Sequence, residues 1–364
     1  MSLNLAYEIA RSGLSANAAA ASVVSRNIAN VDNPDASRKS ATIVGNTNGG
    51  VRIDGIAIAV DAALFESTIE TTASYSQLRS VADALEQLEI IVNDPELGQS
   101  PSALLGELQS ALQAAAAAPH DDRVARTAIA AAAALASGMN RSANVVEGVR
   151  ADADRRLAEN VDRLGNLLAE FETVNNAVVS GEAFGRDNTG SIDARNRLLR
   201  EISELINVRA TTRANNDVVL FAANGATLFE EVPRRISIDP IAALAPGQPG
   251  GALRIDGVPA SAAGAGALGG GLGGLLQVRD TVAVVLGRQL DEIARGLIVA
   301  FAESDQSATP ALPDLAGLFT YAGGPGLPPP GIVLDGLAAD GWIQYHIESG
   351  RLMGRLIGYG EIAA

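Results

Sequence analysis

The chain has 364 residues, which is long enough for about two or three domains with a substantial buried core. Its 42 Asp and Glu residues outnumber 27 Lys and Arg residues, and the net charge of −15 argues against nucleic acid as a partner. Cysteine is absent, so disulfides, zinc–thiolate sites and thiol nucleophiles are excluded.

The first predicted element is a helix over residues 3–31. Small or apolar residues recur there in alternating steps of four and three, as at Ile9, Gly13 and Ala16. An isolated helix with such a face is marginal in water, so we expect it to pack against its own chain or neighbouring subunits. The opening residues resemble no secretory signal and no stretch of about 18 apolar residues occurs, so neither a cleaved signal nor membrane insertion is expected.

The predicted helix ends in the polar stretch SRNIANVDNP, residues 25–34. Asn27, Asn30 and Asn33 follow one another at three-residue steps and therefore share one side of a helix. Their amides are suited to cap the last helix carbonyls or to bridge to neighbouring subunits. Pro34 disfavours helical geometry at Asn33, so the chain is predicted to turn away there. Residues 1–40 are assigned to this first domain.

Residues 41–72 are predicted to form an extended connector. Within it, residues 51–60 alternate in the manner of strands on either side of a turn at Asp54-Gly55. Helical periodicity resumes near Ala73 and stops at Asn93-Asp94-Pro95.

A helix over residues 100–118 is followed by a very long helical segment. From Asp121 or Asp122 to about residue 180, apolar residues keep steps of three and four, and an unbroken helix would be about 90 Å long. After a turn, Ser191 is the predicted cap of an amphipathic helix over residues 191–206. Residues 73–207 are assigned to a long-helix domain.

Residues 208–262 are predicted to form a β-rich insert. Period-two segments separated by short polar turns predict a β meander with strands at 208–213, 218–222 and 226–230. Residues 253–258 are a candidate further strand. Residues 263–305 are assigned to a return helix, and the Pro- and Gly-rich residues 306–364 to an irregular tail. The predicted fold class is α+β, predominantly α: an elongated long-helix bundle with a small β-meander insert and an N-terminal coiled-coil-type helix.

No catalytic, cofactor-binding or metal-binding residue is predicted. His120 and His346 lie in unlike segments without ligand spacing. Residues 264–269 match GxGxxG, yet no strand leads into them as dinucleotide binding requires. The acidic segment 185–193 lacks the alternating ligands of a calcium loop and is interpreted as a turn. The sequence therefore predicts a protein that is not an enzyme.

The N-terminal stretch resembles the signature of bacterial flagellar axial proteins, the family of rod, hook and hook-associated subunits. The matching residues are Ser12-Gly13-Leu14, then Asn27-Ile28-Ala29-Asn30 and Pro34. The resemblance implies that they form an assembly motif in an axial helix that lines an inner tube together with a C-terminal helix of the same chain. Because residues 306–364 show no helical seam, that C-terminal helix is predicted to be missing here.

Two further segments resemble the hook-associated protein 1 subfamily, whose subunits form the first junction between hook and filament. They are DARNRLLREISELI at residues 193–206, and GGLGGLLQVRD at 270–280 with LDEIA at 290–294. The resemblance implies a structural subunit that self-assembles into a ring and leaves the cell through the flagellar type III channel without a cleaved signal. Its implied partners are the hook subunit, the second hook–filament junction protein and a flagellar export chaperone.

Two alternatives remain open. Another axial protein, such as a hook, rod or second junction subunit, would carry the same N-terminal signature. A soluble coiled-coil signalling or interaction protein would also show long amphipathic helices, although a sensory member of that class should carry a transmembrane span.

Overall fold

The structure is a computed structural model that describes residues 3–47, 49–92, 98–239, 248, 250–260, 267–305, 334–338, 341–348 and 351–357. The chain divides into two compact units. The first comprises Met1–Arg79, Leu157–Asp239 and Ala252–Gly274, and the second comprises Ser80–Arg156, Pro240–Gly251 and Leu275–Ala364.

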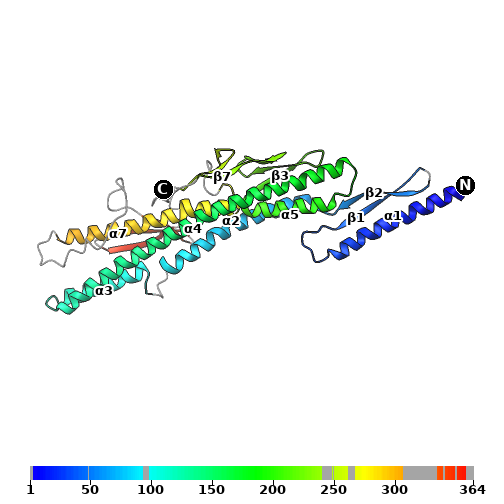
Figure 1. Cartoon of the computed structure of the whole chain (residues 1–364). Coiled ribbons are helices and arrows are strands. Elements are labelled where there is room, and N and C mark those ends of the chain that lie inside the picture. The colour runs from blue at the N-terminus through cyan, green and yellow to red at the C-terminus, as the bar shows by residue number, and fades with distance from the viewer. Residues whose placement is uncertain are drawn as a thin grey trace. The chain divides into compact units, whose positions relative to one another are not determined.

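The first unit opens with a helix that lies along a β-hairpin (Figure 1). Helix α1 (Leu3–Ala29) confirms the predicted N-terminal helix, and strands β1 (Lys39–Gly45) and β2 (Val51–Ile58) pair antiparallel. Ala16 and Val23 are the buried residues of α1. Residues 3–58 are called the N-terminal module below.

The predicted turn at Asp54-Gly55 is wrong. Both residues lie inside β2, and the chain reverses between β1 and β2, where Asn46 bonds Gly50 and Gly49 has a φ of 85°. Thr42 pairs with Gly55 while Ile43 pairs with Ile53, so Asp54 is an extra residue in the ladder. A β-bulge accommodates such a residue without ending the strand, which explains why an Asp-Gly pair does not mark a turn here.

Helix α2 (Ala62–Val92) begins well before the predicted start at Ala73. The Asp61 carboxylate caps it, because Oδ1 accepts the backbone N–H groups of Ala63 at 3.0 Å and Leu64 at 3.1 Å. The first turns contain Ser and Thr, which weaken the apolar periodicity. Residues 41–72 are therefore a hairpin and the start of a helix, and not an extended connector.

The body of the first unit packs two helical segments against small sheets. They are residues 157–183 of helix α4 (Asp122–Ala183) and helix α5 (Thr189–Leu205). Phe171 of α4 meets Phe229 edge to face at a ring-centroid distance of 5.1 Å, and both rings are fully buried. Other fully buried members of this core are Leu164, Leu168, Leu198, Ile202, Leu220 and Leu228.

The predicted β meander is confirmed. Strands β3, β4, β5 and β6 form one antiparallel sheet and β7, β8 and β9 another. Their bounds are Val208–Thr212, Val218–Ala222, Thr227–Glu230, Val232–Pro233, Ile236–Ile238, Leu253–Ile255 and Val258–Pro259. The candidate strand at 253–258 is two short strands, because Asp256 and Gly257 adopt positive φ and turn the chain.

The buried amide of Asn175 ties α4 and α5 to the turn between β3 and β4. Asn175 donates to Asp217 at 2.6 Å, and its oxygen accepts from Arg195 at 3.1 Å and from the Val218 N–H at 3.2 Å. Burial lowers the pKa of Arg195, and the nearby Asp217 carboxylate partly offsets this. These bonds fix the meander on the helices.

In the second unit, helix α3 (Pro101–Ala117) packs against α4 and α7 (Ala283–Asp305). The cluster contains Leu104, Leu108, Ala132, Leu135 and Met139, with Ile293, Leu297 and Phe301 packed against it. The predicted long helix and return helix are confirmed, the latter as α6 (Gly270–Gln277), a π-helical turn (Val278–Val282) and α7.

The π-helical turn carries Arg279, whose side chain is fully buried. Its guanidinium donates to Asp154 at 2.6 Å, to Asp280 at 2.8 Å and to the Gly251 carbonyl at 2.7 Å. Burial opposes the charged form, yet the hydrogen bonds from Arg279 to Asp280 and Asp154 outweigh it and raise the pKa of Arg279. A buried cation paired in this way secures the 250–251 backbone to the helices.

The prediction of an irregular tail over residues 306–364 is wrong for three segments of it. Strands β10 (Leu334–Ala338), β11 (Gly341–Glu348) and β12 (Arg351–Ile357) form a three-stranded antiparallel sheet. Residues of high β-propensity, such as Trp342, Ile343 and Tyr345, favour strands in this part of the tail. The remaining tail residues lie outside the described part of the chain.

Candidate functional site

Helix α1 has an uncovered apolar stripe on one side. Its large residues are spaced by sums of three and four, and each is at least 56% exposed; they are Leu3, Tyr7, Leu14, Val24 and Ile28, and Val31 continues the spacing in the turn just after the helix. Ala10, Asn17 and Ala21 fill the intermediate positions of the same heptad pattern and are exposed as well. A contiguous apolar stripe of this kind is typical of a surface that packs against another helix.

The opposite side of α1 packs against the β1–β2 hairpin. The Ser12 hydroxyl donates to the Ile9 carbonyl at 2.8 Å and accepts the Val51 N–H at 3.1 Å. A Cβ added at Gly50 would lie 2.8 Å from Ser12 Oγ, so glycine permits this approach. A Cβ added at Gly13 would meet nothing within 4 Å, and Leu14 beside it belongs to the uncovered stripe.

The three asparagines of the motif make three different contacts. Asn27 pairs with the backbone of Lys39 by donating to its carbonyl at 2.7 Å and accepting its N–H at 3.0 Å. Asn30 donates to the Arg26 carbonyl at 2.9 Å, which is the predicted helix cap. Asn33 accepts the Asp35 N–H at 3.0 Å and closes a turn over Pro34. Ile28 and Ala29, between the first two, remain exposed.

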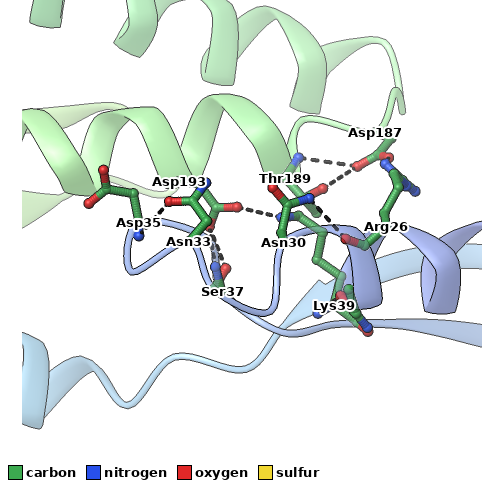
Figure 2. Close-up of polar contacts among 10 residues, drawn as sticks. Arg26, Asn30, Asn33, Asp35, Ser37, Lys39, Asp187, Thr189 and Asp193 are labelled. Carbon is green, nitrogen blue, oxygen red and sulfur yellow. Dashed lines mark hydrogen bonds and ion pairs between the residues drawn. The ribbon is translucent and has the colours of Figure 1, made fainter.

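Three ion pairs join the N-terminal module to α5 and the residues just before it, and they are called the clasp below. Arg26 donates to Asp187 at 2.8 Å, Lys39 pairs with Asp193, and Asp35 pairs with Arg200. Figure 2 shows Asp193 pointing toward Ser37, on the loop that follows α1, and Lys39, at the start of β1. The Ser37 hydroxyl also donates to Asp193, and the Ser37 N–H does so at 3.3 Å.

Asp187 also contacts Thr189, the first residue of helix α5. Its carboxylate accepts the Thr189 N–H at 3.2 Å and the Thr189 hydroxyl at 2.6 Å. Partial burial opposes the charged form, but the bonds from Thr189 and Arg26 outweigh it and lower the pKa of Asp187. The predicted cap at Ser191 is wrong, because α5 starts at Thr189 and places Ser191 within the helix.

An open cleft of about 470 Å³ lies between the loop after α1 and α5. Its lining is mostly charged or amide side chains, with small residues between them: Arg26, Asn30, Asn33, Asp35, Ala36, Lys39, Gly190, Asp193, Ala194 and Arg197. No group of three or more acidic or histidine side chains in the described part of the chain could hold a metal ion. The cleft is a polar region beside the clasp.

Sequence reasoning misses the clasp. It interprets segment 185–193 only as a turn, although Asp187 and Asp193 bind the N-terminal module. Their partners are more than 150 residues away in sequence, at Arg26 and Lys39. The sequence does show an acid–acid–base order at Asp187, Asp193 and Arg200. This order indicates a contact only once the complementary charges of the N-terminal module are known to lie opposite it.

Helix α2 carries a second set of exposed apolar side chains. Leu64, Tyr75 and Leu78 are each at least 60% exposed, and their spacing follows heptad steps. The residues that α2 buries in the first unit, Ile69 and Ala73, lie on its other side. This surface is a second candidate for helix packing between molecules.

A long-helix fold with uncovered apolar stripes is typical of proteins whose helices pack against those of other molecules. The family model of the flagellar hook-associated protein FlgK helical domain matches residues 85–311, more than half of the chain. The chain therefore belongs to the FlgK family, as the resemblance of segments 193–206 and 270–294 predicts. No curated protein sequence matches it significantly.

The fold is also similar to a solved structure, that of the flagellar hook junction protein FlgK from Burkholderia pseudomallei. The TM-score is 0.53 at 20% sequence identity, over 66% of this chain. The chain spans 42% of that protein. The likeness confirms the predominantly α, α+β fold class. Within the described residues, no helix is long and apolar enough to cross a lipid bilayer.

Proposed function

We propose that the chain is a structural subunit of the bacterial flagellum that forms the junction between hook and filament by self-assembly. The observation that carries this proposal is the uncovered stripe of α1, in a chain that belongs to the FlgK family. The name of the similar Burkholderia protein, a flagellar hook junction protein, supports the same role.

The stripe explains how assembly would be driven. Burying a Leu-sized side chain contributes about 1.5–3 kcal/mol, so a partner helix that covers several stripe residues gains enough to offset the cost of association. Leu14 and Ile28 lie on this stripe, while Ser12, Asn27 and Asn30 hold α1 in shape. The motif thus combines a contact surface with its internal support.

The proposed partners are further copies of this chain in a ring, the hook subunit, the second hook–filament junction protein and a flagellar export chaperone. Export through the flagellar type III channel would place the chain outside the cell. Exposed side chains on α2 would provide contacts between neighbouring subunits. No residue is assigned a catalytic role.

The test is complementation of a strain that lacks the gene for this chain. Electron microscopy counts hooks with and without filaments after restoring the wild type, a Leu14→Asp/Ile28→Asp variant or a Ser22→Asp control. Ser22 is exposed on α1 away from the stripe. We expect the wild type and the control to restore filaments, while the stripe variant is exported but leaves bare hooks. Normal filaments in the deletion strain would contradict the proposal.

A further inference from the structure

The turn between β4 and β5 carries the sequence Asn224-Gly225. In such a pair the backbone nitrogen of the glycine can attack Cγ of the asparagine side chain, because the glycine has no side chain to hinder the approach. A bond forms between the Gly225 nitrogen and Cγ of Asn224, and the bond from Cγ to Nδ2 breaks. Nδ2 leaves as ammonia with the proton that the Gly225 nitrogen loses, and water then opens the resulting succinimide to aspartate or isoaspartate.

The folded turn holds both reacting groups in hydrogen bonds, although both residues are exposed to water. The Gly225 N–H donates to the Ala222 carbonyl at 2.8 Å. Asn224 Nδ2 donates to the Ala260 carbonyl at 2.9 Å, and Asn224 Oδ1 accepts the Ala226 N–H at 3.0 Å. The attack requires the side-chain amide to rotate toward a freed Gly225 nitrogen, so these bonds must break first. One net hydrogen bond changes an opening equilibrium about fivefold, and these together about a hundredfold.

Gly225 is required by the backbone of the turn and not by crowding. Its φ of 85° lies in the left-handed region, while a Cβ added there would meet nothing within 4 Å. The Ala222 N–H donates to the Ala226 carbonyl at 2.8 Å, so the hairpin closes with Gly225 as an inserted residue. The turn therefore needs the same glycine that makes Asn224 reactive once the turn opens.

The side chain of Asn224 also joins the two sheets of the first unit. Ala260, which follows β9, is 4% exposed, and its bond from Asn224 connects the β7–β9 sheet to the β3–β6 sheet. Aspartate or isoaspartate has an ionised oxygen where asparagine has the donating NH₂ group. Two acceptors would then face each other, and the buried Ala260 carbonyl would lose this donor.

We propose that Asn224 is a latent modification site: the folded β4–β5 turn protects it from deamidation, and opening of the turn allows an irreversible conversion that unties the two sheets. The reaction needs only water, which reaches the exposed turn. The chain thus accumulates aspartate or isoaspartate at residue 224 in proportion to the time that this turn has spent open.

The test is mass spectrometry of the purified chain, incubated folded or in guanidinium chloride at the same mildly alkaline pH. Digestion after arginine releases residues 214–234, and fragment masses separate deamidation of Asn224 from that of Asn215 and Asn216. We expect Asn224 to convert about a hundredfold more slowly in the folded chain. Equal rates would show that the fold does not protect Asn224, and no conversion in denaturant would show that it is not reactive. Either result overturns the proposal.

A pair of matched variants tests whether opening of this turn controls the reaction. Thr227→Gly weakens β5 beside the turn and should speed conversion in the folded chain about fivefold, without changing the rate in denaturant. Thr212→Gly makes the same change beside the β3–β4 turn and should leave the rate at Asn224 unchanged. Equal acceleration by both variants would contradict control by the β4–β5 turn.

The consequence for the two sheets is tested with Asn224→Asp, which supplies the aspartate product directly. Denaturant unfolding, followed by a probe in the first unit, should show a lower midpoint for this variant than for the wild type. Asn215→Asp is the matched control, because the Asn215 oxygen accepts the Asp217 N–H at 3.3 Å and a carboxylate oxygen fills the same role. Its midpoint should stay close to wild type. A wild-type midpoint for Asn224→Asp would show that conversion does not untie the sheets, and the proposal would be wrong.

Discussion

Lys39 and Asp193 form the most enclosed ion pair between the N-terminal module and α5, with side chains 10% and 12% exposed. Removing water from a charged pair makes each partner costly to leave alone. We predict that Asp193→Asn and Lys39→Met couple by about 2 kcal/mol in a double-mutant cycle, because each single change leaves a partly buried group unpaired. Hydrogen exchange of the Ser37 amide, which donates to Asp193, measures the opening free energy.

The matched control for this cycle is Glu170→Gln with Arg197→Met, an exposed pair at 3.3 Å. Its coupling should stay below about 0.5 kcal/mol. Equal coupling in the two cycles would show that enclosure of Lys39 and Asp193 does not strengthen their interaction.

Asn27 is predicted to hold the end of α1 to β1 through its side-chain amide. Asn27→Ala removes both bonds to the Lys39 backbone and should speed exchange of the Lys39 amide by about tenfold, the effect of one net hydrogen bond. The Asn17→Ala variant, on the exposed stripe, serves as the comparison and should leave that amide unchanged. Protection unaffected by Asn27→Ala would mean that the strand, and not the amide, orders this residue.

The aromatic contact in the first unit should carry much of its stability. Phe171→Ala removes a fully buried ring that meets Phe229 edge to face, so we expect a loss of about 3–5 kcal/mol in the free energy of unfolding. Phe184→Ala, a ring 72% exposed, should cost less than about 1 kcal/mol. Denaturant unfolding of both variants, with a probe in this unit, compares the two losses.

Asp187 should titrate below 3.8, its ordinary pKa, because the bonds from Thr189 and Arg26 outweigh the opposing effect of burial. Since the folded-state pKa is the lower one, the charged carboxylate stabilises the fold above the unfolded pKa. This contribution is lost as the pH falls through the folded-state pKa. NMR titration of the carboxyl carbon measures the value, and Arg26→Gln should raise it. An unchanged pKa in that variant would remove Arg26 as a cause.

The exposed side chains on α2 should affect association and leave folding intact. Leu64→Lys/Leu78→Lys places two charges on the exposed side of the helix, where neither side chain is packed. We expect the helical content and the unfolding midpoint to stay close to wild type, while filament formation in the complementation strain is reduced. Thr71→Lys, a smaller change on the same side, is the intermediate case.

Local patterns in the sequence are sufficient for most helices, the β meander and the family. The long helix α4 has a capping aspartate and an apolar repeat, and the meander has period-two segments between polar turns, so each is encoded within a short stretch. The motif SGL and NIAN is likewise a contiguous signal. The asparagine cap at Asn30 follows from local geometry, and the structure has that contact.

Tertiary structure alone decides where the hairpin turns, where α2 begins and what the charged residues bind. Whether Asp54-Gly55 is a turn or a bulge depends on the strand opposite it, which local propensity does not specify. The local sequence around Asp187 and Asp193 indicates only a turn. Their partners lie on a segment that is distant in sequence and that folding brings to α5. Helices have a sequence periodicity, so the stripe on α1 is visible in the sequence. Ion pairs have none, so the clasp beside it is seen only in the folded structure.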